Sequence, residues 1–202
     1  MSEIKEQVQA FVHRYLEVNP EEKAVIVDYA LRTWQPLPQS VKYLQFIGVV
    51  ATGKTRAAMV MYAICKNPLY PAGHMSPRAL VSMMDEKYPC TLILDEFDSL
   101  NHLVTGKVLE FGDEGGKRLT RSIKQDNGTF EVKMFQTFGY KVLCSYAKFK
   151  NPAIQSRCIP VELSHLTRND IPPVLGDEFE KDSVAIQQAL SAFYGEVPAL
   201  AH

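Results

Sequence analysis

The strongest chemical signal in the chain is a loop that reads Gly48-Val49-Val50-Ala51-Thr52-Gly53-Lys54-Thr55 and satisfies the pattern G-x-x-x-x-G-K-(S/T). Glycines let backbone N–H groups turn inward around phosphate oxygens, and the start of a following helix adds partial positive charge. We expect Lys54 to neutralise the β- and γ-phosphates of ATP and Thr55 to offer its hydroxyl to Mg²⁺. The alternative is a glycine-containing turn with an exposed lysine.

Two adjacent acids, Asp95 and Glu96, follow the apolar run Thr91-Leu92-Ile93-Leu94. Carboxylates beside a buried strand are costly unless they emerge at its carboxyl end, where α/β sheets bind ligands. We expect Asp95 to hold Mg²⁺ through a water and Glu96 to polarise the attacking water. Such a pair can also be a helix N-cap. Its position after the P-loop, with a helix and a strand between, favours the catalytic interpretation.

Two further residues are candidates for catalysis. Ser145 stands near the end of the apolar segment Lys141-Val142-Leu143-Cys144, where a hydroxyl could touch both the γ-phosphate and the attacking water. Arg157 stands just before the last expected strand, where it could reach a neighbouring subunit's nucleotide. The alternatives, a strand-end hydroxyl and a structural salt bridge, stay open.

Charge is balanced overall but uneven along the sequence. The chain has 22 basic and 23 acidic residues, yet nine basic residues stand between positions 117 and 157 against Asp126 and Glu131. A hairpin signal, Asp126-Asn127-Gly128, lies in this stretch. The basic residues around it that we expect to contact a phosphodiester backbone are Lys117, Arg118, Arg121 and Lys124. The alternative is an ordinary solvated β-ribbon.

The elements that must position these residues can be read from hydrophobic spacing and capping signals. We expect helices at 2–18, 20–34, 54–65, 77–87, 102–111 and 180–194, and strands at 43–47, 91–94, 140–146 and 158–163, besides the hairpin at 122–135. This alternation predicts an α/β fold with a mainly parallel sheet flanked by helices. The expected organisation is a helical lead-in (1–40), a P-loop core (41–165) and a short helical tail (166–202). We interpret this tail as a reduced lid.

Composition bears on the expected cellular location, the state of the cysteines and the expected metal. The chain has 202 residues, 46% of them apolar, and no apolar run long enough to cross a bilayer, and with its polar N-terminus we expect a cytoplasmic protein without membrane contact. Its four cysteines are widely spaced and contain no C-x-x-C pair, which favours reduced thiols. Its five histidines show no metal-ligand spacing, so Mg²⁺ is the metal that we expect.

The pattern resembles ATPases of the additional-strand, catalytic-glutamate division, and particularly the AAA+ branch. Ile154-Gln155-Ser156-Arg157-Cys158 is similar to the Ser-Arg-Cys motif of clamp-loader ATPases, whose arginine acts on the adjacent subunit's ATP. The resemblance implies a homo-oligomer in which Arg157 is a finger that acts in trans.

Most of the chain, about 30–163, also resembles an uncharacterised P-loop domain of phage and plasmid primase- and helicase-associated proteins. The shared features are Ala30-Leu31-Arg32-Thr33-Trp34, Tyr43-Leu44, Gly115-Gly116, Phe138-Gly139 and Ser156-Arg157-Cys158-Ile159. Related helicases carry a β-hairpin before the sensor strand that touches DNA inside a ring, and 122–135 occupies that place. The chain departs from the AAA+ pattern at Ala51, where a second loop glycine is common, and after Leu163, where no complete helical lid follows and Arg168 is the nearby sensor-2 candidate.

These features lead to the expectation of an oligomeric Mg²⁺-dependent ATPase that acts on nucleic acid in replication, unwinding or packaging of a mobile element. Its expected partners are a primase, a nuclease or a packaging machine. One alternative is a small-molecule P-loop kinase, which needs an acceptor pocket. Another is an assembly module that uses nucleotide binding to order subunits, with little turnover.

Overall fold

A five-stranded parallel sheet forms the centre of the molecule. The computed structural model describes residues 2–71, 75–95, 102–124, 128–165 and 167–195. The sheet has the strand order β2-β3-β6-β1-β7. Its strands are β1 (Tyr43–Ile47), β2 (Pro68–Leu69), β3 (Thr91–Leu94), β6 (Lys141–Ser145) and β7 (Cys158–Glu162). Strand β6 therefore lies between the strand that enters the P-loop and the strand that ends at Asp95.

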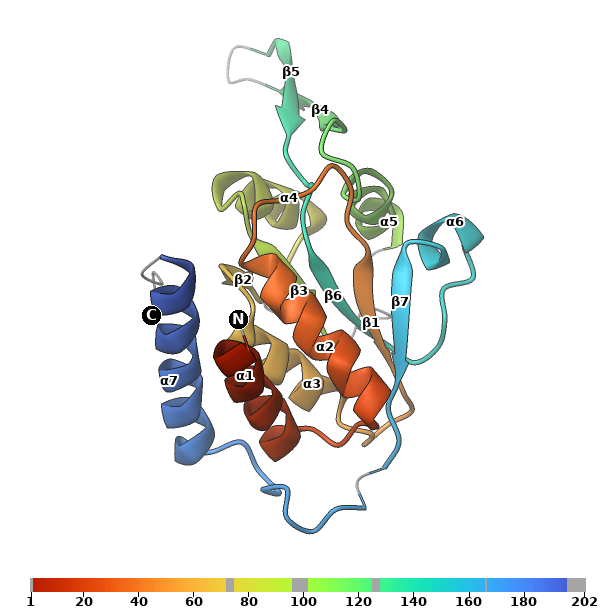
Figure 1. Cartoon of the computed structure of the whole chain (residues 1–202). Helices are drawn as coiled ribbons and strands as arrows, with labels where there is room; N and C mark the ends of the chain where they lie inside the picture. The colour runs from red at the N-terminus through yellow and green to blue at the C-terminus, as the bar shows by residue number, and fades with distance from the viewer. Residues whose placement is uncertain (1, 72–74, 96–101, 125–127, 166, 196–202) are drawn as a thin grey trace.

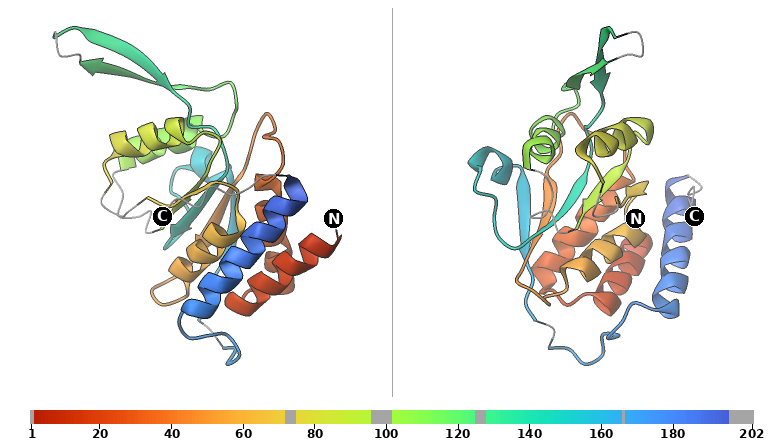
Figure 2. Two further views of the ribbon diagram at one scale, coloured as in Figure 1. Left: turned by 90° about the vertical axis from the view of Figure 1, so that its left-hand side faces the viewer. Right: turned by 180° about the vertical axis from the view of Figure 1, so that it is seen from behind.

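The helices pack in two groups on the two faces of this sheet (Figures 1 and 2). One group contains α1 (Ser2–Tyr15), α2 (Pro20–Thr33), α3 (Lys54–Ile64) and α7 (Asp177–Tyr194). The other contains α4 (Pro77–Glu86), α5 (His102–Phe111) and the short α6 (Pro152–Gln155). This three-layer arrangement confirms the predicted α/β fold with a mainly parallel sheet.

Local sequence explains where the N-terminal helices begin and how they pack. The Asn19 side chain accepts a hydrogen bond from Glu22 N at 2.8 Å, and Asn19 N donates to Glu22 Oε2 at 3.2 Å, which is a capping box at the start of α2. The Tyr15 ring packs edge-on against Phe179, with centroids 4.9 Å apart. Helix α7 thus lies along α1 and α3; whether it is a reduced lid stays a prediction.

The predicted hairpin is present as a separate two-stranded antiparallel sheet, β4 (Leu119–Lys124) and β5 (Phe130–Phe135). It extends away from the body of the molecule (Figure 1). Residues 125–127, at the predicted turn, lie outside the described residues. The exposed apolar side chains of β5 are Phe130 at 70%, Val132 at 67% and Met134 at 66%.

A buried lysine closes the base of this hairpin. Lys141 Nζ donates to the carbonyl oxygens of Gly112 at 3.0 Å, Thr137 at 2.9 Å and Gly139 at 3.0 Å. Gly139 N also donates to Gly112 O at 3.2 Å. Because Gly112 precedes the hairpin and the other two follow it, both of its roots are fixed at the edge of the core.

Candidate functional site

The P-loop begins where β1 ends, and its first glycine has no room for a side chain. Gly48 N donates to Ser145 O at 3.2 Å, which ties the loop to the neighbouring strand β6. A Cβ at Gly48 would lie 2.2 Å from Thr52 Oγ1 and 3.1 Å from Leu163 O. The sequence therefore needs glycine at this position for the loop to close on itself.

Two further loop residues adopt left-handed backbone conformations. Gly53 has φ +86° and Ala51 has φ +64°. The Thr52 hydroxyl donates to Val49 O at 2.9 Å and braces the turn between them. Gly53 is the N-cap of α3 without a side-chain hydrogen bond, so the first-turn N–H groups of α3 face the loop without a competing cap. Ala51 occupies the position where a second glycine is common, at some cost in backbone strain.

The Lys54 ammonium lies over the loop. Its Nζ donates to Gly48 O and to Val49 O, both at 2.7 Å, and lies 4.5 Å from the ring centroid of Tyr146. Thr55, the next residue, is exposed at the start of α3. Thus the cation and the hydroxyl of the motif both lie at the carboxyl end of the sheet.

Cys144, a buried thiol of β6, lies beside the helix that begins at Lys54 and on the strand next to the one that precedes Asp95. Asp95, directly after β3, is half-buried and accepts a hydrogen bond from Tyr70 OH at 3.1 Å. Burial raises the pKa of the Cys144 thiol, the nearby Asp95 carboxylate raises it further, and Lys54 opposes the shift. The Cys144 thiol also donates to Lys54 O at 3.5 Å, so it lies beside the start of α3. Glu96, the predicted base, lies outside the described residues.

Ser145 lies at the end of β6, beside the P-loop, but its side chain is fully buried. Its hydroxyl donates to Ala147 O at 3.0 Å and accepts from Gln45 Nε2 at 2.9 Å. Gln45 Oε1 in turn accepts from Gln155 Nε2 at 3.1 Å. This network links β6, β1 and α6, and contact of Ser145 with a γ-phosphate stays a prediction.

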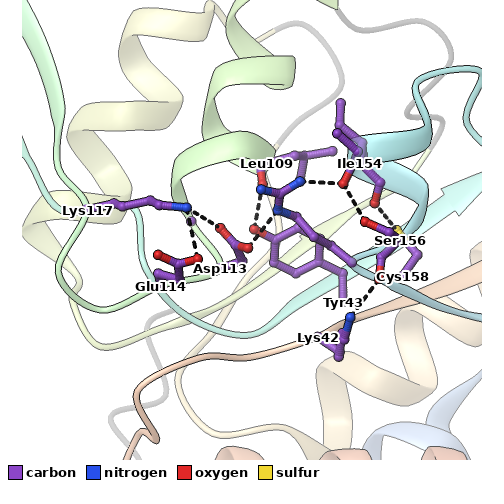
Figure 3. Close-up of polar contacts among 12 residues, drawn as sticks. Lys42, Tyr43, Leu109, Asp113, Glu114, Lys117, Ile154, Ser156 and Cys158 are labelled. Carbon is purple, nitrogen blue, oxygen red and sulfur yellow. Dashed lines mark hydrogen bonds and ion pairs between the residues drawn. The ribbon is translucent and has the colours of Figure 1, made fainter.

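Arg157 lies at the opposite end of the sheet from its own P-loop. Its carbonyl accepts a hydrogen bond from Tyr43 N, the first residue of β1, at 2.8 Å. Five strand residues separate this point from Gly48, a distance of about 15 Å. Arg157 Nε is 2.6 Å from Oδ2 of Asp113, which is labelled in Figure 3, and Arg157 Nη1 donates to Ala153 O. Within its own subunit, Arg157 is thus one half of an ion pair.

The four predicted nucleic-acid contacts lie along the hairpin and its root, in different environments. Lys117 Nζ is 3.1 Å from Glu114 Oε1, and Arg118 Nη1 donates to Gly115 O at 2.8 Å. Arg121 pairs across the hairpin with Lys133. The fourth, Lys124, pairs with Phe130, and the structure describes its backbone alone. The structure brings none of these residues to the P-loop.

Several residues at the site were missed by sequence reasoning. Tyr146, 51% exposed beside Lys54, and the thiol of Cys144 are ordinary residues at the end of an apolar strand, and nothing in their spacing marks them. Gln45 did carry a signal, because it is the amide side chain in the mostly apolar and fully buried strand Tyr43–Ile47. A buried amide in a central strand must have hydrogen-bond partners, and these turn out to be Ser145 and Gln155.

The chain thus has an α/β fold with a parallel central sheet, and a loop that satisfies the P-loop pattern follows β1 at the carboxyl end of that sheet. It is similar to a structure of JCV helicase with a bound thiazolopyridine acetamide, at 13% identity and a TM-score of 0.47, over 96% of this chain and 64% of the helicase chain. A second inhibitor-bound JCV helicase structure aligns at 15% identity and a TM-score of 0.44, over 83% of this chain and 46% of the other.

This chain thus spans less than two thirds of the length of either helicase chain. No protein-family profile and no curated protein matches the sequence. Among the described residues, no helix combines the length and the apolar character that a membrane span requires.

Proposed function

We propose that this chain binds ATP with Mg²⁺ and hydrolyses it. The observation that carries the proposal is the geometry of the loop between β1 and α3, where Lys54 Nζ donates to Gly48 O and Val49 O, at the same end of the parallel sheet as Asp95. In such sheets this end is where ligands bind. A phosphate chain in this place would meet a cation and loop amides on one side and a carboxylate on the other.

The donor set fits the magnesium salt of a nucleoside triphosphate. Thr55 and Asp95 offer hydroxyl and carboxylate oxygens, which Mg²⁺ prefers. The loop that starts at Gly48 closes too tightly to admit a Cβ at this position. Mg²⁺ would supply charge neutralisation of the phosphate oxygens. Lys54 would add a second positive charge, and Glu96, next to Asp95 in sequence, would accept a proton from the attacking water.

The strand order supports a finer classification. Strand β6 lies between β1 and β3, and we propose that β6 is the additional strand after which the catalytic-glutamate division is named. Ser145 ends this strand beside the P-loop, as expected of a sensor residue. The AAA+ assignment adds Arg157, whose place at the far end of β1 suits action on a neighbouring subunit's nucleotide. We therefore propose a homo-oligomer in which each site is completed by the next subunit.

The hairpin supports contact with a polyanion. Arg121 and Lys133 lie directly opposite each other on β4 and β5. Like charges in this arrangement repel and destabilise a two-stranded sheet, so a phosphodiester backbone bound across them relieves the repulsion. We propose that the hairpin contacts nucleic acid through this pair together with Lys117, Arg118 and Lys124. Exchange of Arg121 and Lys133 for glutamine should weaken binding and flatten its salt dependence.

Steady-state phosphate release from ATP with Mg²⁺ tests the proposal. Wild type should turn over, Glu96→Gln should bind ATP but hardly release phosphate, and Lys54→Ala should lose tight nucleotide binding. Near-normal turnover of Glu96→Gln would assign the base elsewhere. Retained affinity of Lys54→Ala would remove the phosphate-binding role from this loop.

Single- and double-stranded DNA added to this assay separate the remaining alternatives. Turnover that rises with DNA supports a nucleic-acid motor, and turnover indifferent to DNA points to a protein partner such as a primase, nuclease or packaging machine. Nucleotide-dependent assembly without turnover would favour the assembly module. Phosphate transfer that requires an added small-molecule acceptor would favour the kinase.

A mixture of two inactive variants tests the trans role of Arg157. Subunits with Arg157→Ala keep an intact P-loop, and subunits with Lys54→Ala keep an intact Arg157. Mixed oligomers should recover part of the activity, because some interfaces then combine both intact parts. No recovery would mean that Arg157 either acts in cis or has a structural role in its own subunit.

A further inference from the structure

Asp113 is a buried carboxylate that faces two cations of its own subunit (Figure 3). Its Oδ2 lies 2.6 Å from Arg157 Nε, and its Oδ1 lies 3.7 Å from Lys117 Nζ. Asp113 is 8% exposed, and within the described ranges its Oδ1 accepts no hydrogen bond. One oxygen is therefore closely paired with Arg157, whereas the other has a cation near it but not in contact.

The backbones on both sides of this ion pair are fixed. Arg157 O accepts from Tyr43 N at 2.8 Å, and Asp113 O accepts from Val41 N at 2.9 Å, so both residues are tied to the segment that enters β1. The side chains have more freedom, because 21% of the Arg157 side chain and 33% of the Lys117 side chain are exposed. A change of partner at Asp113 can thus occur by side-chain rotation without movement of the sheet.

We infer that Asp113 holds Arg157 back from the neighbouring subunit's nucleotide, and that Lys117 replaces Arg157 at Asp113 when Arg157 is released. The inference rests on the proposed trans role of Arg157. A buried carboxylate left without a cation is strongly destabilising, so Arg157 can leave only if another cation takes its place. The competing anion is the phosphate chain of a nucleotide bound by the adjacent subunit, which attracts a guanidinium through paired hydrogen bonds.

Two variants shift this competition in opposite directions. Asp113→Asn keeps the shape of the side chain but removes its charge, so Arg157 is released more easily. Lys117→Met removes the replacement cation, so release of Arg157 leaves Asp113 unpaired. A purely structural ion pair predicts no such opposition, because both changes would only lower stability.

The matched control is Asp28→Asn. Asp28 Oδ2 lies 2.6 Å from Arg32 Nε, the same distance between the same atom types, but both side chains are more than half exposed, at 57% and 59%. Removal of this exposed pair is expected to cost little. It therefore reports the general effect of breaking one Asp–Arg pair in this chain.

Assembly and phosphate release are measured together, by sedimentation and by a phosphate assay, against subunit concentration with Mg²⁺ and ATP. Nucleic acid is left out, so that contacts of Lys117 with a phosphodiester backbone do not affect the measured assembly or phosphate release. Asp113→Asn should lower the subunit concentration for half-maximal assembly by about three- to fivefold. This factor corresponds to the free energy of one modest ion pair. Lys117→Met should raise this concentration by a larger factor, because release of Arg157 then leaves the buried Asp113 without a cation. Asp28→Asn should leave it unchanged.

Opposite shifts of the two variants support the inference. Normal assembly of wild type with no shift in either variant, or shifts in the same direction, overturns it and leaves the ion pair structural. Wild type that neither binds ATP nor assembles overturns the proposed function, and this inference with it. If circular dichroism shows that Asp113→Asn is unfolded, Lys117→Met decides alone: a raised concentration supports the inference and an unchanged one overturns it.

Discussion

Replacement of Gly48 by alanine tests the geometry of the P-loop directly. The added Cβ would lie 2.2 Å from Thr52 Oγ1 and 3.1 Å from both Thr52 Cβ and Leu163 O. The first contact is too short for any real structure, so the Thr52 side chain must move. Its hydroxyl then gives up the hydrogen bond to Val49 O that braces the loop.

The cost of Gly48→Ala can be estimated from these contacts. Loss of the Thr52 hydrogen bond costs about 1 kcal/mol. Displacement of the backbone at Leu163, as in an overpacked core, costs about 1–3 kcal/mol more. The sum is about 2–4 kcal/mol, which for a chain of this size lowers Tm by about 10 °C. Nucleotide affinity should fall as well, because the same loop is the proposed phosphate site.

Thermal unfolding followed by circular dichroism measures this effect, with Gly116→Ala as the control. A Cβ at Gly116 meets nothing within 4 Å, so this change should alter stability by less than about 0.5 kcal/mol. The double variant Gly48→Ala/Thr52→Ala should recover part of the lost stability, because the 2.2 Å contact is then absent. A Gly48→Ala protein with wild-type Tm and nucleotide affinity would refute the loop geometry.

Three further changes have expected outcomes. Asn19→Ala should lower the free energy of unfolding by about 1 kcal/mol in urea titrations, because the capping box of α2 is lost. Ala51→Gly should raise Tm slightly, by the equivalent of up to about 1 kcal/mol, because φ +64° strains alanine; a lower Tm would contradict that conformation. Burial lowers the pKa of Lys141 from its ordinary 10.5 to about 7, so between these values the unfolded chain binds more protons than the folded chain. The stability of wild type relative to Lys141→Met should therefore rise with pH over this window in urea titrations, and a fall would reverse the sign of the shift.

Much of the fold could be predicted from sequence because its signals are local. The cap at Asn19, the apolar run Thr91–Leu94 and the helix after Lys54 each place an element whose observed bounds differ by a few residues at most. Strand β2 (Pro68–Leu69) and helix α6 (Pro152–Gln155) were not predicted. With two and four residues, they are too short for any hydrophobic period to show.

In the candidate site too, some features could be predicted from local sequence and others could not. The P-loop is contiguous in sequence, so its residues and the departure from the common pattern at Ala51 could be identified, but the positive φ of Ala51 was not predicted. The polar partners could not, because Gln45 and Ser145 are 100 positions apart and Arg157 and Asp113 are 44 apart. Such pairs depend on strand order and helix packing, which no local pattern encodes. The proposed roles of Glu96, Ser145 and Arg157 stay predictions.

The buried Lys141 joins the two ends of the hairpin, so the hairpin can change without a change in the core. Because its ammonium and the bond from Gly139 N to Gly112 O join the two roots, the chain leaves and re-enters the core at almost one point. A loop whose ends are already joined can change in length at little entropic cost. Residues 119–135 can thus diverge, or be replaced by a short turn, while the sheet and P-loop persist. A change of the hairpin can then leave the proposed phosphate site unaltered.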